Sequence, residues 1–221
     1  MTPRFLPAAG VSLFVAALCA APFALSTYGV DVLDSVGLYA LLALSLNLVL
    51  GEAGLYDMGH AAFFAVGAYT TAILTTRLGL PLLATLPAAA LAAGLFAALV
   101  ALPVLRLRGD YLLIVTVGLG EIVRIALVND VGGWTGGANG IFGIPRPVLF
   151  GTKLKTPEQL FWLIWGAVGL TVLVFRRLSA SRFGRQLRAT AEDEVAAEGS
   201  GVPTARARLT AFVLGSAWAG M

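Results

Sequence analysis

The stretch LLATLPAAALAAGLFAALVALPVL, Leu82–Leu105, contains no charged side chain. A helix of this length rises about 36 Å, at about 1.5 Å per residue, and this exceeds a hydrocarbon core of about 30 Å. The whole chain is similar in character: 58% of its 221 residues are hydrophobic, 12% are charged, and the mean hydropathy is +0.88. Soluble domains carry roughly 25% charged residues. The sequence therefore predicts an all-α membrane protein, a polytopic bundle of transmembrane helices.

Other apolar runs on either side of this stretch are long enough to span a bilayer if modest tilt or a helix break is allowed. They cover residues 11–28, 32–50, 61–76, 111–128 and 160–175. A final run, Leu209–Met221, is too short to cross alone. We therefore expect one membrane domain over residues 1–221 with about six complete spans, a truncated seventh, and further sequence missing at the C-terminus. The first run follows Arg4 and could instead be a cleaved signal peptide, but its length favours a retained helix.

Basic residues are distributed unevenly between the two sides of this arrangement. If the N-terminus is cytoplasmic, ten of these basic residues lie inside and four outside. An excess of Lys and Arg is typical of cytoplasmic loops. The inside set is Arg4, Arg106, Arg108, Arg176, Arg177, Arg182, Arg185, Arg188, Arg206 and Arg208; the outside set is Arg77, Arg146, Lys153 and Lys155. Because these residues collect beside apolar runs and not among exposed aromatics, nucleic-acid binding is not expected. Cys19 is the only cysteine, so the chain can form no internal disulfide.

A charged island, GRQLRATAEDEVAAEGSGV, Gly184–Val202, separates two apolar segments. It predicts an amphipathic helix within a cytoplasmic segment, residues 179–208. A helix placed there in so apolar a chain is expected to touch a soluble partner.

The stretch GEAGLYDMGHAAFFAVGAY, Gly51–Tyr69, interrupts the path between the second and third spans. Glycines weaken helices, and carboxylates exposed to lipid are costly, so this backbone must face protein or water. It is either a broken, re-entrant element or an ordinary cytoplasmic turn with close packing through small residues. A lone histidine has no partners for a metal site or for nucleophilic catalysis. The candidate translocation or gating residues here are Gly51, Gly54, Asp57, Gly59 and His60.

Two more motifs stand out. In RLRGDYLLIVTVGLGEIVR, Arg106–Arg124, the residues Glu121 and Arg124 lie three apart on one helical face. We expect them to pair and to face the bundle interior, either as a gating pair or as a structural pair near the outer interface. The glycine-rich TGGANGIFGIP, Thr135–Pro145, has no Lys followed by Ser or Thr, so it does not complete a phosphate-binding loop.

The order and spacing of these motifs resemble those of the LivM-like permease subunits of the branched-chain amino acid ABC transporter family. The resemblance is carried by LNLVLGEAGLYDMGHAAFFAVGAYTTAIL from Leu46, by the motifs at Arg106 and Thr135, and by the charged island with the following RARLTAFVLGSAWAG. It covers nearly the whole chain after about residue 30.

The resemblance implies a bacterial inner-membrane importer with a second permease, two ATPases and an extracytoplasmic substrate-binding protein. ATP and Mg²⁺ would bind the ATPases, leaving this chain without catalysis, metal or cofactor. The charged island would be the coupling helix, with Glu194, Ala197, Glu198 and Gly201 at the ATPase. Gly201 would end the helix in a left-handed conformation, and Arg185 and Arg188 would hold it at the anionic lipid surface.

One departure from the family concerns Asp57, which stands where many members have serine; this puts a hydroxyl-based substrate contact in doubt. An importer of urea, short amides or other small organic solutes would share the same architecture. An autonomous channel or a membrane scaffold is disfavoured, because neither needs a cytoplasmic helix of this kind.

Overall fold

The computed structural model describes residues 8–105, 107, 110–149, 152–154 and 156–221 of the chain. Within these residues, helices are joined by short turns, and one small antiparallel hairpin pairs Val148 with Lys153 and Leu149 with Thr152. The elements in order are α1 (Ala8–Ala24), α2 (Thr27–Leu46), the π-helix η1 (Asn47–Glu52), α3 (His60–Arg77), α4 (Leu82–Val104), α5 (Asp110–Val128), the 3₁₀ turn η2 (Gly137–Asn139), β1 (Val148–Leu149), β2 (Thr152–Lys153), α6 (Pro157–Ala180), α7 (Arg182–Glu192), α8 (Glu194–Gly199) and α9 (Thr204–Gly220).

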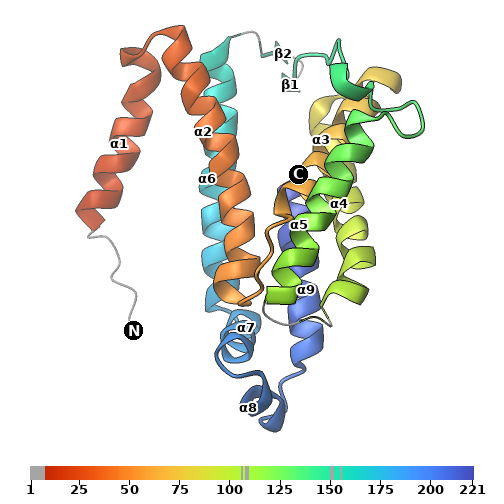
Figure 1. The fold of residues 1–221 in the computed structure, drawn as a ribbon. Coiled ribbons are helices and arrows are strands. Elements are labelled where there is room, and N and C mark those ends of the chain that lie inside the picture. Colours follow the sequence, from red (N-terminus) through yellow and green to blue (C-terminus); the bar gives the residue numbers. More distant parts are fainter. Residues whose placement is uncertain (1–7, 106, 108–109, 150–151, 155) are drawn as a thin grey trace.

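The long helices stand side by side, and the short elements gather at the two ends of the bundle (Figure 1). η2, β1 and β2 lie at one end, here called the hairpin end; α7 and α8 lie at the other, here called the α7–α8 end. Helix α1 stands apart from the rest of the bundle, α2 packs along α6, and α9 packs among α2, α3 and α4. Among the basic residues of the predicted charge bias, Arg4, Arg106, Arg108 and Lys155 lie outside the described residues.

Four helical segments of the described chain are long and apolar enough to cross a membrane: Thr27–Glu52, Leu82–Val104, Asp110–Val128 and Pro157–Ala180. This confirms an all-α, multi-pass membrane protein, but it does not by itself reach the predicted count of six complete spans and a seventh. Helices α1 and α9 have 17 residues each. Helix α3 has 18, and its polar ends, His60 and Arg77, lower its hydropathy.

The boundary between the first two predicted spans is wrong. We expected the first span to continue to Tyr28, but helix α1 ends at Ala24. Helix α2 begins at Thr27, and Ser26, its N-cap residue, has an extended backbone. The predicted seventh run also changes, because the helix starts at Thr204 and includes the polar residues before Leu209.

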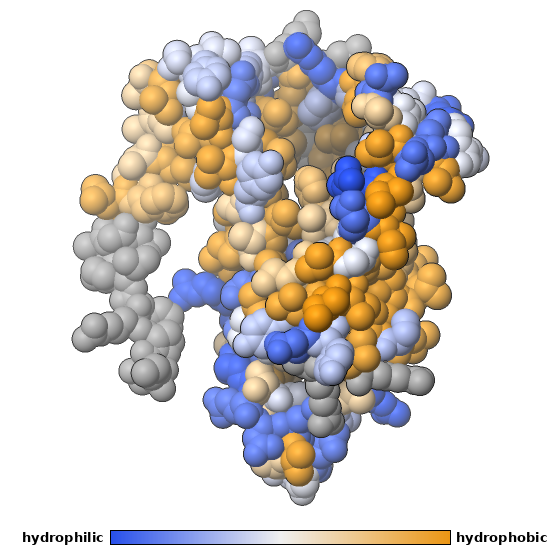
Figure 2. Space-filling model, viewed as in Figure 1, coloured by the Kyte–Doolittle hydropathy of each residue, from blue (hydrophilic) through white to orange (hydrophobic). Residues whose placement is uncertain are grey.

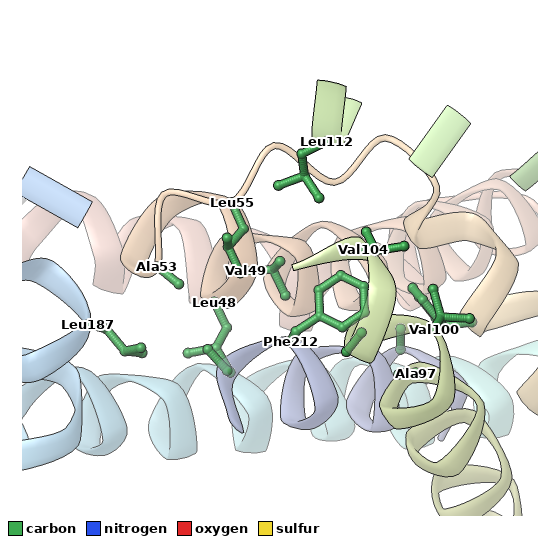
Figure 3. Packing of buried hydrophobic residues seen from close by; sticks show 14 of the residues in the cluster. Leu48, Val49, Ala53, Leu55, Ala97, Val100, Val104, Leu112, Leu187 and Phe212 are labelled. Atoms are coloured by element: carbon green, nitrogen blue, oxygen red, sulfur yellow. The ribbon is translucent and has the colours of Figure 1, made fainter. Parts of the chain in front are cut away.

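Helix α9 forms the centre of the packed core. Small residues on one side of it, including Ala207, Ala211 and Gly215, are buried and allow close approach of its neighbours. Phe212 meets the ring of Phe63 of α3 edge-on, with centroids 5.4 Å apart. In lipid, such tight contact is the main force that joins helices, because the tails are as apolar as the side chains. Figure 3 shows part of this core, with Leu48, Val49, Leu55, Val100, Val104, Leu112, Leu187 and Phe212 converging from several helices.

The middle of the bundle presents a hydrophobic surface, and polar side chains gather towards its two ends (Figure 2). Only 17% to 33% of the residues in the four apolar windows are buried within the chain. Most of the membrane-facing surface is therefore available to lipid or to another subunit.

Candidate functional site

The segment between α2 and α3 turns back into the bundle. Helix α2 continues into the π-helical turn η1, and residues 53–59 then run back along the bundle, so that α3 begins at His60 inside it (Figure 1). Leu55, Asp57 and His60 are each at most 3% exposed. The structure thus distinguishes the two interpretations of the Gly51–Tyr69 motif: the element is broken and re-entrant. We call residues 53–59 the re-entrant segment.

A chain of buried polar groups holds the end of this segment. His60 Nδ1 lies 3.0 Å from Asp57 Oδ2, and His60 Nε2 lies 2.9 Å from Ser45 Oγ of α2. The other Asp57 oxygen accepts the Gly59 N–H at 3.0 Å. The order Asp–His–Ser is that of a hydrolase triad, but the Ser45 side chain is wholly buried, so no substrate can reach its oxygen. The network therefore positions the start of α3.

The re-entrant segment is also joined to α5. Met58 N–H donates to Thr116 Oγ1 at 3.1 Å. Gly59 lies so close to α5 that a β carbon at this position would sit 2.2 Å from the Thr116 carbonyl oxygen. Only glycine allows this approach, because any side chain would force the two backbones apart.

Glu121 and Arg124 of α5 form the predicted ion pair. Arg124 donates to the Glu121 carboxylate from Nε at 2.9 Å and from Nη2 at 2.6 Å. The predicted orientation towards the bundle interior is wrong for this chain, since the Glu121 and Arg124 side chains are 52% and 63% exposed. They line an open groove of about 450 Å³ between α3 and α5, together with Met58, Gly59 and mostly apolar side chains. We call it the α3–α5 groove.

A second ion pair ties the other end of the re-entrant segment to α7. Glu52, the last residue of η1, accepts Arg188 Nη1 at 2.7 Å and Ser179 Oγ at 2.6 Å. Two residues on, a β carbon at Gly54 would lie 3.0 Å from the β carbon of Ala191 in α7. At Gly51, in η1, a β carbon would lie 2.2 Å from Oδ1 of Asn47, four residues earlier in the chain. The sequence patterns did not predict this link. Arg188 pairs with Glu52 and stays 45% exposed.

The charged island forms two helices and not one. Asp193, with φ −152° and ψ 105°, interrupts the helix between α7 and α8 and accepts the N–H groups of Val195 and Ala196. Helix α8 ends with Gly201 at φ +83°, which confirms its predicted left-handed conformation. Gly201 N–H donates to Glu198 O and Val202 N–H to Ala197 O, and this pair of bonds is a Schellman motif.

The four predicted coupling residues are only partly available to a partner. Ala197 is buried against its own chain, and Glu194 accepts Arg208 Nη1 of α9 at 2.8 Å. Glu198 is exposed and accepts Thr204 Oγ1. Val195, which sequence reasoning did not select, is 73% exposed at the tip of α8. Helix α8 thus has one exposed face, which includes Val195 and Glu198 and is called its free face. Its other side contacts α9 through Glu194 and Arg208.

At the hairpin end, the glycine-rich motif folds around a carboxylate. Asp130 Oδ1 accepts the backbone N–H and hydroxyl of Thr135 and the N–H of Gly136. These hydrogen bonds from Thr135, followed by that from Gly136, hold the pKa of Asp130 below its usual range. The motif is an ordered surface loop; within the described residues, no group of three or more His, Cys, Asp or Glu side chains could hold a metal ion.

Comparisons with known proteins point to one kind of protein. A profile of the family described as branched-chain amino acid transport system / permease component matches residues 28–221. The high-affinity branched-chain amino acid transport system permease protein LivM of Escherichia coli K12 is 41% identical over 95% of this chain and 54% of its own length. Its counterpart from Salmonella typhimurium LT2 is 40% identical over 90% of the chain and 52% of its own length. The chain thus spans about half the length of these relatives. No solved structure matches it significantly.

Proposed function

The chain belongs to the family of branched-chain amino acid transport system permease components, and on this premise we propose that it is a membrane-spanning subunit of an ATP-driven importer. The resemblance seen in the sequence motifs is confirmed by this membership. The two relatives named above are branched-chain amino acid permease proteins, which supports the same substrate class here. The location that goes with this function is a bacterial inner membrane.

The proposed arrangement in the membrane has six spans, α1 to α6, followed by α9 as a seventh membrane helix. It is supported by the path of the chain: α1, α3 and α5 run towards the hairpin end, and α2, α4 and α6 run back (Figure 1). The α7–α8 end would face the cytoplasm, because Arg176, Arg177, Arg182, Arg185 and Arg188 lie there and basic residues favour the cytoplasmic side.

The observation that carries the proposal is that α8 is exposed at the end of the bundle while α7 and α9 pack against it. A helix of six residues with a free face projects from the bundle end, while α7 behind it contacts α9 and the re-entrant segment. A surface of this kind suits a soluble partner that pushes or pulls on the bundle. ATP and Mg²⁺ are assigned to two ATPase partners; the other partners are a second permease and an extracytoplasmic binding protein.

Co-purification with an affinity tag on the native full-length permease tests the assembly. An ATPase and a second permease should be recovered in stoichiometric amounts. Reconstituted vesicles should then take up labelled leucine, isoleucine and valine only with ATP and the binding protein. Uptake of urea or short amides, with no uptake of these amino acids, would overturn the substrate assignment; uptake without ATP would overturn the importer.

A further inference from the structure

The α3–α5 groove carries an ion pair at a depth where charges are costly. Glu121 lies 11 residues beyond Asp110 in α5, a rise of about 16 Å, which is near the middle of a hydrocarbon core of about 30 Å. Both side chains are more than half exposed in the chain. A charged pair at this depth is stable only against protein or in a water-filled cavity. This face of α5 therefore does not face lipid.

We propose that the α3–α5 groove binds a zwitterionic aliphatic amino acid, with Arg124 at its carboxylate and Glu121 at its ammonium group. The inference rests on the proposed function and assigns residues of this chain to the substrate. A volume of about 450 Å³ lies within the usual range of small-molecule sites, about 300 to 1,000 Å³.

The Glu121–Arg124 ion pair can bind the carboxylate and the ammonium group of an amino acid and stay intact. Arg124 uses Nε and one Nη2 proton on Glu121, so its Nη1 protons and the second Nη2 proton can donate to a carboxylate. The Glu121 oxygens keep lone pairs for an ammonium group. Charge-assisted bonds of this type are the strong ones, and guanidinium suits a carboxylate best.

The rest of the lining fits an aliphatic side chain. Ala61 and Ala65 of α3 and Val117 and Leu127 of α5 line the groove. Among the described residues of the lining, Glu121 and Arg124 alone are charged. Apolar walls with one fixed zwitterionic partner select for a molecule that has both charges at one end. A neutral amide lacks those charges, and an amine or carboxylic acid satisfies only half of the pair.

Thiol protection in the assembled, reconstituted transporter tests the site. The variant carries Cys19→Ser and Val117→Cys, and its labelling rate with a water-soluble maleimide is measured without ATP. Ala61→Cys reports from the opposite wall, and Leu78→Cys, an exposed position outside the groove, is the control. Leucine should slow labelling at positions 117 and 61 but not at 78. Leucinamide, which lacks the carboxylate, and 4-methylpentanoate, which lacks the ammonium group, should protect poorly.

Charge removal gives the decisive comparison. In Arg124→Gln or Glu121→Gln, the half-protecting leucine concentration should rise about tenfold or more. Equal protection by all three compounds, or none by leucine, would overturn the site. So would thiols that are already blocked in the assembled complex before leucine is added, because another subunit would then fill the groove. Leucine uptake by the unmodified transporter in the same vesicles tests the proposed function separately.

Discussion

Arg188 of α7 and Glu52 of η1 are joined by a 2.7 Å ion pair across 136 positions of sequence. Ser179 at the end of α6 shares the same carboxylate. Glu52 immediately precedes the re-entrant segment, whose far end is held by Asp57, His60 and Thr116. One short piece of chain, in which alternate residues are buried, thus connects α7 to the start of α3 and to the side of α5. We expect a displacement of α7 to be passed on through it.

Removing this link should uncouple ATP hydrolysis from transport. Arg188→Gln loses a partly exposed ion pair, worth about 1 kcal/mol or less, so permease abundance should stay near normal. The number of leucine molecules imported per ATP hydrolysed should fall. Arg185→Gln is the matched control, because Arg185 lies on the same helix and donates to a backbone carbonyl, that of Ala180. An unchanged ratio of leucine imported to ATP hydrolysed in Arg188→Gln would contradict the role of the link. The charge swap Glu52→Arg with Arg188→Glu should bring this ratio back towards that of the unmodified protein.

The buried Asp57–His60 pair should matter for stability. Asp57→Ala leaves the imidazole and the Gly59 N–H without their acceptor, and each buried donor left unsatisfied costs about 1 to 3 kcal/mol. The melting temperature of the purified protein in detergent should drop clearly. Asp57→Asn should lose less, because its amide oxygen can still accept the Gly59 N–H. Met58→Ala, at an exposed neighbouring residue, serves as control, and a melting temperature for Asp57→Ala equal to that of the control would show that the pair is dispensable.

The membrane orientation can be tested with reporters. A fusion after Arg188 should be cytoplasmic, and insertions between Asn139 and Lys155 should be extracytoplasmic, because basic residues favour the inside by ten to four. Alkaline phosphatase and green fluorescent protein fusions give opposite signals on the two sides. The reverse pattern of signals would invert the proposed topology.

Helix length was predictable where charged or turn-forming residues end an apolar run. Helices α4 and α5 lie within one residue of the predicted runs Leu82–Leu105 and Tyr111–Val128. The break between α1 and α2 was missed, because Leu25 to Tyr28 contains no charged residue, glycine or proline to end the run. Ser26, a residue type favoured at helix N-caps, was the signal that could have shown it. Helix α6 was predicted too short, since Arg176 and Arg177 continue it beyond the membrane core.

The local parts of the site were also predictable, and the long-range parts were not. Spacing on one helix placed Glu121 beside Arg124, and backbone preference placed Gly201 at a helix end. The orientation of the pair depends on how α3 packs on α5, which periodicity does not encode. Ser45 and His60 meet only through the return of the re-entrant segment. Glu52 and Arg188 meet because α2 packs along α6 and α7 folds against η1. Spacing and residue preference along one element predict neighbours within that element and not contacts between distant elements.

The end of α8 offers the sharpest test of the proposed coupling surface. Gly201 has φ +83° and closes the Schellman motif with Glu198 and Ala197. A side chain in this left-handed conformation costs about 1 to 2 kcal/mol, and valine, being β-branched, is poorly suited to it. Gly201→Val should therefore turn the end of α8 and displace its free face. Gly199→Val is the matched control, because Gly199 lies within the helix with open space around its β position.

Reversing the charge at Glu198 tests the same surface of α8 in a different way, through electrostatics. Glu198 is exposed on α8, so Glu198→Arg should not disturb membrane insertion. If α8 contacts the proposed ATPase partner, the reversed charge should oppose that contact. In Gly201→Val and Glu198→Arg, leucine uptake and transport-stimulated ATP hydrolysis should fall together. Permease abundance should stay near normal in both. The control Gly199→Val should behave as the unmodified protein. If both variants accumulate, assemble with the ATPase and transport at the unmodified rate, α8 is only a solvated connection between α7 and α9, and energy must enter the bundle elsewhere.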